Sequence, residues 1–491
     1  MRIVRGAGCR PRRGAWNGPD GTFNAHQASR LETVTARRLL SGWGRTAPSA
    51  AAVHSPLSTD DIAAELAGAP ARGVIARGLG RSYGDVAQNA GGLVLDLTGM
   101  NRILAFDEAE GIVTCEGGCS LADLIARCLP AGWFLPVVPG TRYVTAGGAV
   151  ANDVHGKNHH RDGSFGEHVL SLTLLTPAGE LRELDPARTP QEFRATVGGL
   201  GLTGVIVEVT LRLVPVETGV MRVTTERAPT LEHALDRLTA TDHLHRYSVA
   251  WLDCAIAGRG FGRALLLRGD HATRAELPAD RQSEALAPPS ERGIGVPPWA
   301  SLAPLIRPAT VAAFNELYFK AAREDEGALQ ALGPFFFPLD AVRNWNRIYG
   351  RSGFLQYQFV VPFGAENALL ELVRLVSSGP RPAALVVLKR FGGSEGLLSF
   401  PQPGWTVAID IPLPAAGLGP LLDVADDIVA STGGRVYLAK DSRLRRDRLR
   451  AMYPQLAEWE ETRAALDPDG RMRSDLARRL GVGRQVRART R

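Results

Sequence analysis

The chain has 491 residues, of which 45% are hydrophobic, and this length allows two or three domains with substantial cores. The formal net charge of +6 is concentrated at the ends, because residues 1–45 contain nine arginines against two acids and residues 471–491 contain eight arginines against one. The interior is therefore mildly acidic. It nowhere combines a basic stripe with stacking aromatic residues, so we expect no nucleic-acid partner.

Further classes are excluded by local composition. No apolar run approaches the ~20 residues that span a bilayer, and the arginine-rich start lacks the apolar segment of a secretory signal. We therefore expect a protein that is cytoplasmic or peripheral at the plasma membrane. The five cysteines are odd in number and match no zinc spacing, which indicates a reduced compartment. The predicted disordered extension, residues 1–29, and the predicted basic tail, residues 483–491, are compatible with solvated segments or with contact to anionic lipid.

The first informative segment is a glycine loop at residues 76–86, which follows a short apolar strand. Gly78, Gly80 and Gly84 give a GxGxxxG spacing, a near miss to the dinucleotide-binding fingerprint. The polar, glycine-rich residues that follow do not continue as a helix, which argues against a nicotinamide-type site. Bare backbone N–H groups in such turns form concave sites for phosphate oxygens, so we interpret the loop as an anion cradle.

The second informative segment is the loop at residues 139–160, which contains four glycines, two threonines and three histidines. A glycine cradle followed by titratable side chains indicates a phosphate-bearing cofactor with chemistry beside it. The spacing of His155, His159 and His160 also resembles a metal site. Asp153 is the only carboxylate nearby, however, so we predict no metal.

The other predicted elements indicate an α+β fold in two modules. A helix begins after the capping residue Ser120, with an acid three residues later. The first module ends near residue 216 and has strands at 93–97, 102–106, 112–115, 169–175, 180–184 and 205–213. The second module has an antiparallel sheet, with strands at 247–253, 354–361, 384–389 and 405–410 and helices at 230–238, 366–376 and 418–431.

Polar side chains interrupt the apolar pattern of the second module and of the strand that follows it. Lys440 ends an apolar strand, where it is either a strand-end charge or a site group. Gln356 and Gln358 alternate with apolar residues and share one face, which is either solvated or ligand-binding. Lys389, at the end of another strand, is suited to meet a phosphate as a point charge.

Together these motifs resemble the decaprenylphosphoryl-β-D-ribose 2′-oxidases, which are flavoproteins with the vanillyl-alcohol-oxidase, or PCMH-type, FAD-binding fold. The resemblance is carried by both glycine loops, by VYLAKDSR near the C-terminus, and by FLQYQF, LSFPQPGW and AMYP in the expected order, and it extends from residue 42 to about 480. It implies an FAD-binding domain split in sequence, at 30–217 and 435–482. Between these parts, residues 218–434 would form a substrate domain whose antiparallel sheet roofs the flavin.

The resemblance implies an FAD-dependent oxidoreductase acting on CH–OH groups. It would oxidise the 2′-hydroxyl of a polyprenylphosphoryl-β-D-ribose to the 2′-keto sugar by hydride transfer to flavin N5. A nicotinamide-dependent short-chain reductase would complete the 2′-epimerisation toward the arabinose donor of cell-wall arabinan. Arg81 stands where covalent members of the wider superfamily often have histidine, which implies FAD held without a covalent bond. Two alternatives stay open: an FAD-dependent aldonolactone or alditol oxidase on a soluble sugar, similar to D-arabinono-1,4-lactone oxidase, and a flavin-binding protein without turnover.

The resemblance also implies site residues. The catalytic residues would be Lys440, His155 and Tyr83, with Lys440 orienting the alcohol or stabilising oxyanion character. The substrate would contact Gln356, Gln358, Lys389, Trp251, Ser248, Phe391 and Lys440. The FAD would contact Ala76, Arg77, Gly78, Leu79, Gly80, Arg81, Ser82, Tyr83, Gly84, Asp85, Val86, Gly140, Thr145, Ala146, Gly147, Gly148, Asn152, Asp153, Val154, His155, Ile206 and Tyr437.

Overall fold

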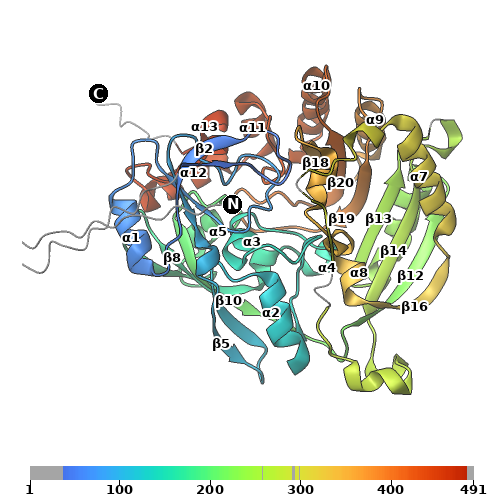
Figure 1. Ribbon diagram of the computed structural model, residues 1–491, viewed down its shortest axis with the longest axis horizontal. Helices are drawn as coiled ribbons and strands as arrows, with labels where there is room; N and C mark the ends of the chain where they lie inside the picture. The colour runs from blue at the N-terminus through green and yellow to red at the C-terminus, as the bar shows by residue number, and fades with distance from the viewer. Residues whose placement is uncertain (1–36, 257, 290–292, 298, 484–491) are drawn as a thin grey trace, which may run out of the picture. The chain divides into compact units, whose positions relative to one another are not determined.

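The computed structural model describes residues 37–256, 258–289, 293–297 and 299–483 (Figure 1). The predicted N-terminal extension, residues 1–29, lies outside the described residues, as does the predicted basic tail apart from Gly483. Mixed helices and sheets confirm the predicted α+β class. The proposed domain boundaries stay a prediction.

A small mixed sheet carries the first glycine loop. Its strand order is β1-β2-β4-β3, with β1 antiparallel to β2 and the other neighbours parallel. The strands are β1 (Arg37–Leu40), β2 (Ser49–His54), β4 (Leu93–Asp96) and β3 (Val74–Arg77). Helix α1 (Thr59–Ala67) packs on this sheet through its buried Ile62 and Leu66. The glycine loop leaves the carboxyl end of β3, the buried strand at the sheet edge, and its position is therefore fixed by the core beneath it.

An antiparallel five-stranded sheet carries the second glycine loop. Its order is β5-β6-β10-β8-β9, with strands Ile103–Asp107, Ile112–Glu116, Val205–Arg212, Val169–Leu175 and Leu181–Leu184. Helix α2 (Leu121–Cys128) begins as predicted, because the Ser120 side chain accepts a hydrogen bond from the N–H of Asp123. The other helices of this part are α3 (Ala146–Ala151), α4 (His159–Asp162) and α5 (Pro190–Thr196).

Most of the remaining chain forms an eight-stranded sheet in which all neighbouring strands are antiparallel, on the right of Figure 1. Its order is β16-β12-β14-β13-β19-β20-β18-β21, and the strands in this order are Asp325–Ala331, Val220–Ala228, Arg263–His271, Tyr247–Asp253, Leu385–Phe391, Gly404–Pro412, Phe354–Pro362 and Arg435–Val436. The sheet confirms the predicted antiparallel arrangement and adds β12, β14 and β16, which sequence patterns did not identify.

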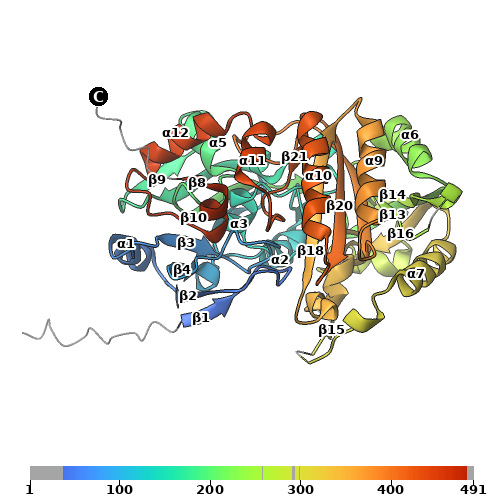
Figure 2. The same cartoon turned by 90° about the horizontal axis from the view of Figure 1, so that it is seen from above.

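The two faces of this sheet differ because side chains alternate along each strand. One face is apolar. Helices α9 (Glu366–Ser377) and α10 (Leu418–Ser431) cover it at β18, β19 and β20, and α6 (Leu231–Thr241) covers it at β12, β13 and β14. Figure 2 shows α9 and α10 over these strands. The other face bears the polar residues of β18, β19 and β20 and looks toward the glycine loops.

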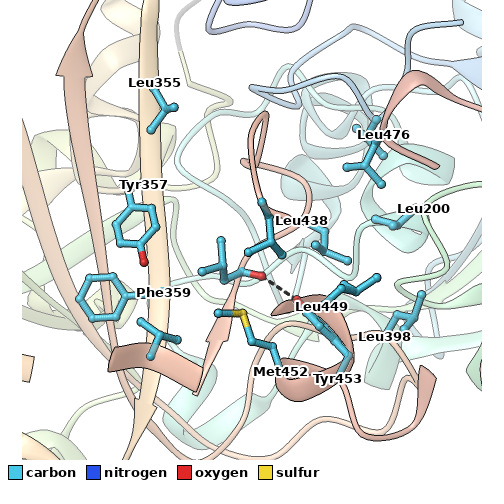
Figure 3. Packing of buried hydrophobic residues seen from close by; sticks show 14 of the residues in the cluster. Leu200, Leu355, Tyr357, Phe359, Leu398, Leu438, Leu449, Met452, Tyr453 and Leu476 are labelled. Atoms are coloured by element: carbon cyan, nitrogen blue, oxygen red, sulfur yellow. Dashed lines mark hydrogen bonds between the residues drawn. The ribbon is translucent and has the colours of Figure 1, made fainter. Parts of the chain in front are cut away.

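The C-terminal segment returns to the first part of the chain. Helices α11 (Arg446–Met452), α12 (Leu456–Leu466) and α13 (Asp475–Leu480) follow β21. The indole N–H of Trp459 donates to the carbonyl of Ala195, and Met472 forms a bridge with Val74. In Figure 3, Leu438, Leu449 and Met452 pack between β18 and Leu200, so one apolar core joins the sheet to strands β2, β3 and β4 and to helix α13.

The last elements lie beside the eight-stranded sheet. Helices α7 (Pro308–Ala321) and α8 (Leu332–Phe336) precede β18, and the small strand pairs are β7 with β11 (Trp133–Phe134, Val214–Pro215) and β15 with β17 (Ile294–Gly295, Val342–Arg343). Among the described residues, no helix combines the length and the apolar character needed to cross a membrane.

Candidate active site

A cavity of about 970 Å³ lies between the two glycine loops and the polar face of the eight-stranded sheet. This volume is at the upper end of the range for sites that hold a small ligand or cofactor. The cavity brings together residues that are up to several hundred positions apart in the sequence. The predicted site residues that line it are Ala76, Arg77, Gly78, Leu79, Gly80, Arg81, Ser82, Tyr83, Val86, Gly140, Thr145, Gly147, Gly148, Asn152, Val154, His155, Ile206, Trp251, Gln356, Gln358, Lys389, Tyr437 and Lys440.

The first glycine loop presents backbone donors to the cavity. The N–H groups of residues 78–82 donate to no acceptor in the described part of the protein. Below the loop, the Arg77 guanidinium donates to the carbonyls of Ser41 (2.8 Å) and Ala87 (3.0 Å), which fixes the loop to its own sheet. Because backbone N–H groups are rarely left without a partner, this loop is suited to hold the oxygens of an anionic group.

The two glycine loops meet at Gly78. A Cβ atom at this position would lie 2.2 Å from Oγ1 of Thr145, so only glycine permits this approach. Thr145 is itself fixed, because its Oγ1 accepts from the N–H of Gly148 (3.2 Å) at the start of α3. The contact between the loops thus sets the width of the cradle.

A chain of three polar side chains crosses the sheet end of the cavity. Nζ of Lys440 donates to Oε1 of Gln356, and Nε2 of Gln356 donates to Oδ1 of Asp410 at 2.5 Å. An ammonium only donates and a carboxylate only accepts, so the Gln356 amide has a single compatible orientation. Oδ2 of Asp410 is buried and has no protein partner among the described residues. It is therefore free to accept a hydrogen bond from a ligand.

Burial shifts the pKa values of Lys440 and Asp410, the two ends of this hydrogen-bonded chain, toward neutral pH. It lowers the pKa of Lys440 to about 7, a shift that the nearby Asp410 carboxylate opposes. It raises the pKa of Asp410 to about 6. Lys440 also lies over the ring of Tyr83, with Nζ 3.9 Å from the ring centroid. A lysine with such a pKa can exchange a proton near pH 7, which a solvated lysine cannot.

His155 is held on the sheet side by Gln358. Nε2 of Gln358 lies 3.0 Å from Nε2 of His155 and 3.2 Å from Oγ1 of Thr406. Burial, and next the charge of Lys389, lower the pKa of His155 well below its usual value. The imidazole is therefore neutral, accepts at Nε2 and carries its proton on Nδ1. Nδ1 has no protein partner among the described residues, so this N–H is available to a ligand.

Two further lysines give the cavity a positive charge. Nζ of Lys157 donates to the carbonyl of Phe335, and burial lowers the pKa of Lys157 to about 7. Burial likewise lowers the pKa of Lys389 to about 8. Neither lysine forms an ion pair with any acid in the described part of the chain. Buried ammonium groups without counter-ions favour an anionic ligand.

Away from these lysines the cavity wall is apolar. Val387 of β19 and Trp251 of β13 are paired in the sheet, and the ring of Tyr318 packs edge-on against Trp251 with centroids 4.9 Å apart. Phe314 stacks on Tyr318 with centroids 6.1 Å apart. The wall therefore changes from charged to aromatic as it leaves the Lys440 end.

Six predicted site residues do not line the cavity: Gly84, Asp85, Ala146, Asp153, Ser248 and Phe391. A Cβ at Gly84 would lie 1.7 Å from the carbonyl oxygen of Asp441, and Asp85 accepts from Arg479 at 2.8 Å. These two residues thus fix the first loop to the C-terminal segment. Ala146 is fully buried within the core around the second loop.

The other three also lie behind the wall. Asp153 accepts from Ser164 Oγ (2.7 Å) and from Ser399 Oγ (2.5 Å), and is completely buried. Ser248 on β13 is buried, and its N–H donates to the carbonyl of Lys157. Phe391 packs against the ring of His155, with centroids 4.7 Å apart, and so supports the imidazole from behind.

The structure adds three residues that sequence patterns missed: Lys157, Thr406 and Asp410. Thr406 and Asp410 have the same parity as the cavity-lining Ala408 on β20, so period-two alternation contained the signal. Lys157 lies within the second loop, between His155 and His159, and no periodic pattern there indicates which side chains face the cavity.

Sequence comparisons agree with this geometry. A family described as FAD binding domain matches residues 50–185, and the D-arabinono-1,4-lactone oxidase family matches residues 419–480. The decaprenylphosphoryl-beta-D-ribose oxidase of Mycolicibacterium smegmatis is 42% identical over 463 residues, which cover 92% of this chain and 99% of that protein. The chain belongs to the decaprenylphosphoryl-β-D-ribose oxidase family. It is an FAD-dependent oxidoreductase, as the sequence motifs predicted.

Two further relatives match smaller parts of this chain. An uncharacterized protein of Streptomyces coelicolor is 42% identical over 372 residues, covering 74% of this chain and 99% of that protein. An L-gulono-1,4-lactone dehydrogenase of Mycobacterium tuberculosis is 31% identical over 221 residues, 44% of this chain and 50% of that protein.

The cavity fits FAD. The N–H groups of residues 78–82, which have no acceptor in the described part of the protein, can donate to the oxygens of a diphosphate. Gly78 has no side chain to block this approach. Buried polar atoms without protein partners, including Nδ1 of His155 and Oδ1 of Asn152, belong to residues that line the same cavity. These atoms match the hydrogen-bonding edge of a flavin better than an apolar ligand.

Proposed function

We propose that the protein oxidises the 2′-hydroxyl of a polyprenylphosphoryl-β-D-ribose to the 2′-keto sugar, the first half of a 2′-epimerisation toward an arabinose donor. The observation that carries this proposal is the order of groups along one cavity wall. The polar chain of Lys440, Gln356 and Asp410 is followed by the unneutralised Lys389 and then by the aromatic side chains around Trp251. This order matches a sugar, a phosphate and a prenyl chain.

Oxidation of a secondary alcohol removes a hydride from carbon and a proton from oxygen. FAD, when bound, supplies the hydride acceptor. Lys440 would accept the hydroxyl proton at Nζ, since a pKa of about 7 leaves much of the amine neutral at physiological pH. Gln356 would hold this amine in place, and Oδ2 of Asp410 would accept from a second sugar hydroxyl. The proton then leaves from Lys440 to solvent after the keto product departs.

Further residues of the cavity would position the ligands. The Nδ1–H of His155 would donate to the cofactor or to the sugar, and Tyr83 would support Lys440 through its ring. Lys389 and Lys157 would bind the substrate phosphate as point charges. Trp251 would contact the first prenyl units. Arg81, whose guanidinium lies 3.9 Å from the Trp43 ring centroid, would border the cofactor.

We propose that the FAD is held without a covalent bond. A guanidinium at position 81 cannot form the bond to the flavin methyl group that histidine forms in covalent members of the wider superfamily. Acid precipitation should leave a colourless pellet and a yellow supernatant. A yellow pellet after washing would contradict the proposal.

Anaerobic bleaching of the flavin absorbance tests the substrate directly. We expect bleaching by prenylphosphoryl ribose within one turnover, and none by the 2′-epimeric arabinose compound at the same concentration. Bleaching by free alditols or aldonolactones instead would favour the aldonolactone oxidase alternative, which the match at residues 419–480 supports. No bleaching by any of them would favour a flavin-binding protein without turnover.

The proposed reaction implies a pathway partner and a cellular location. The 2′-keto product requires a nicotinamide-dependent short-chain reductase to complete the epimerisation. Because the substrate is a lipid, the protein would work in the cytoplasm or at the surface of the plasma membrane. The FAD-binding domain would comprise residues 30–217 and 435–482, with the substrate domain between them.

A further inference from the structure

Exposed apolar side chains gather in one short segment. Seven of the fifteen exposed large hydrophobic residues in the described part of the protein lie between positions 294 and 318. We call them the apolar ridge: Ile294, Trp299, Leu302, Leu305, Phe314, Leu317 and Tyr318. Scattered apolar residues on a surface need no explanation, but a concentration such as this marks an interaction site.

The ridge is fixed in place by polar anchors and not by apolar burial. Helix α7 has 14 residues, of which only Val311 and Asn315 are buried. Nδ2 of Asn315 donates to the buried carboxylate of Asp253 (2.7 Å), and Arg263 pairs with both Asp253 and Glu316. These contacts hold the helix against β13, so its apolar side chains are exposed in an ordered position. Figure 2 shows α7 on the opposite side of β13 and β14 from α6.

The ridge is continuous with the active-site cavity. Leu302, Leu305, Phe314 and Tyr318 line the cavity as well as the surface, and Tyr318 packs on Trp251 inside it. The cavity therefore opens through the ridge. A prenyl chain that left the cavity along the Trp251 wall would pass directly over these side chains.

We propose that the apolar ridge docks on the lipid bilayer, so that the cavity opens at the membrane surface where a prenyl-linked substrate resides. This inference rests on the proposed function, because a lipid substrate would have to pass from the bilayer into the cavity over these apolar side chains. Trp299 and Tyr318 belong to the residue types that prefer the membrane interface. Insertion of apolar side chains supplies the binding free energy.

The charge of the segment distinguishes this docking from attraction to anionic lipid. Residues 294–326 contain three cations against four acids. Half of the arginines in the basic block at 471–491 are engaged in the fold: Arg471 donates to the carbonyl of Leu66, Arg473 donates to the carbonyl of Gly470, Arg478 pairs with Asp475, and Arg479 pairs with Asp85 and Asp441. We therefore expect binding through the ridge to be independent of salt and of anionic lipid.

Flotation of the FAD-loaded protein with vesicles tests the proposal. We expect binding to phosphatidylcholine vesicles that is unchanged by 0.5 M salt and by deletion of residues 484–491. The double variant Trp299→Ser/Leu317→Ser removes two side chains that are 85% and 69% exposed and that do not line the cavity. It should weaken vesicle binding at least tenfold, as expected for the loss of two inserted apolar side chains.

The control variant Leu57→Ser/Leu244→Ser removes side chains that are 71% and 62% exposed elsewhere on the surface, and it should bind vesicles as the unmodified protein does. Equal binding by the ridge variant, or binding that needs anionic lipid and disappears in salt, would overturn the proposal. A dimer that dissociates in the ridge variant, seen by light scattering, would assign the ridge to a second copy of the chain instead. Vesicle binding is measured without turnover, so a failed bleaching test would reject the proposed substrate without affecting this result.

Activity gives a second readout. The ridge variant should oxidise a short, water-soluble prenylphosphoryl ribose at the unmodified rate and lose at least tenfold in kcat/KM toward a long-chain substrate in vesicles. Equal loss on both substrates would show that the substitutions damage the cavity itself, and would contradict a docking role.

Discussion

Nε2 of Gln358 lies 3.0 Å from Nε2 of His155, although the two residues are 203 positions apart. This contact joins the eight-stranded sheet to the second glycine loop and selects the tautomer that exposes Nδ1–H to the cavity. Gln358→Leu should therefore leave the imidazole without its donor and raise the dissociation constant of FAD about tenfold, in line with the ~1–3 kcal/mol for an unsatisfied buried polar atom.

Fluorescence titration of the apoprotein with FAD measures this effect. Gln402→Leu is the matched control, because Gln402 donates to the carbonyl of Gly433 at a distance from the cavity and should not alter FAD affinity. An unchanged affinity in Gln358→Leu would mean that His155 does not contact the cofactor.

The pH dependence of turnover should report the pKa of Lys440. Burial lowers this pKa to about 7, so the neutral amine forms as the pH rises through 7. If the neutral amine accepts the hydroxyl proton, kcat/KM increases between pH 6 and 8 and then levels off. Lys440→Arg, which stays charged, should remove this rise and reduce kcat by roughly 10²–10⁴. A flat profile for the unmodified enzyme over this range would exclude Lys440 as the proton acceptor.

Asp410 should set the midpoint of that profile. Its carboxylate raises the pKa of Lys440, so Asp410→Asn should shift the midpoint to lower pH, by on the order of one unit. A purely structural role would change stability without moving the midpoint.

Asp426→Asn is the control for the effect of Asp410. Asp426 is also buried with a raised pKa of about 6, but it pairs with Arg443 and accepts from the hydroxyl of Tyr357 on the apolar face of the sheet. It should destabilise the fold and leave the midpoint in place. If the pH profiles of kcat/KM have the same midpoint in both variants, the Asp410 carboxylate does not raise the pKa of Lys440.

The contact between the glycine loops should control flavin retention. Gly78→Ala places a Cβ 2.2 Å from Oγ1 of Thr145, so the loops must separate and the cradle must widen. We expect the flavin-to-protein ratio after gel filtration to fall and the dissociation constant of FAD to rise at least tenfold. Gly419→Ala on α10, where a Cβ meets nothing within 4 Å, should keep full flavin content. Full retention in Gly78→Ala would show that this contact does not shape the cofactor site.

Both glycine loops could be located from the sequence because they depend on backbone chemistry. Glycines that permit close approach are visible in any local window, and both loops were identified in this way. Gly84, Asp85, Ala146 and Asp153 share the motif but do not line the cavity, and their contact with the cofactor stays a prediction. Within a loop, the sequence does not tell which side faces the ligand.

The substrate side could be predicted only where strand periodicity applies. Alternation put Gln356 and Gln358 on one face, and both line the cavity. Ser248 does not line it, because the face of β13 that meets the cavity depends on the pairing of β13 with β19, and its contact with the substrate stays a prediction. Asp410 could not be predicted, because its place in the site depends on the hydrogen bond from Gln356 on the neighbouring strand.

By itself, the sequence determined the family and the FAD cofactor and located the two glycine loops, because long motifs identify a family without any knowledge of their neighbours in space. The tertiary structure alone decided which charges are buried together. Burial lowers the pKa values of Lys440, Lys389 and His155 and raises that of Asp410, and the docking of α7 leaves the apolar ridge at the mouth of the cavity. Desolvation and charge interaction depend on distance in space, which no local pattern along the chain contains.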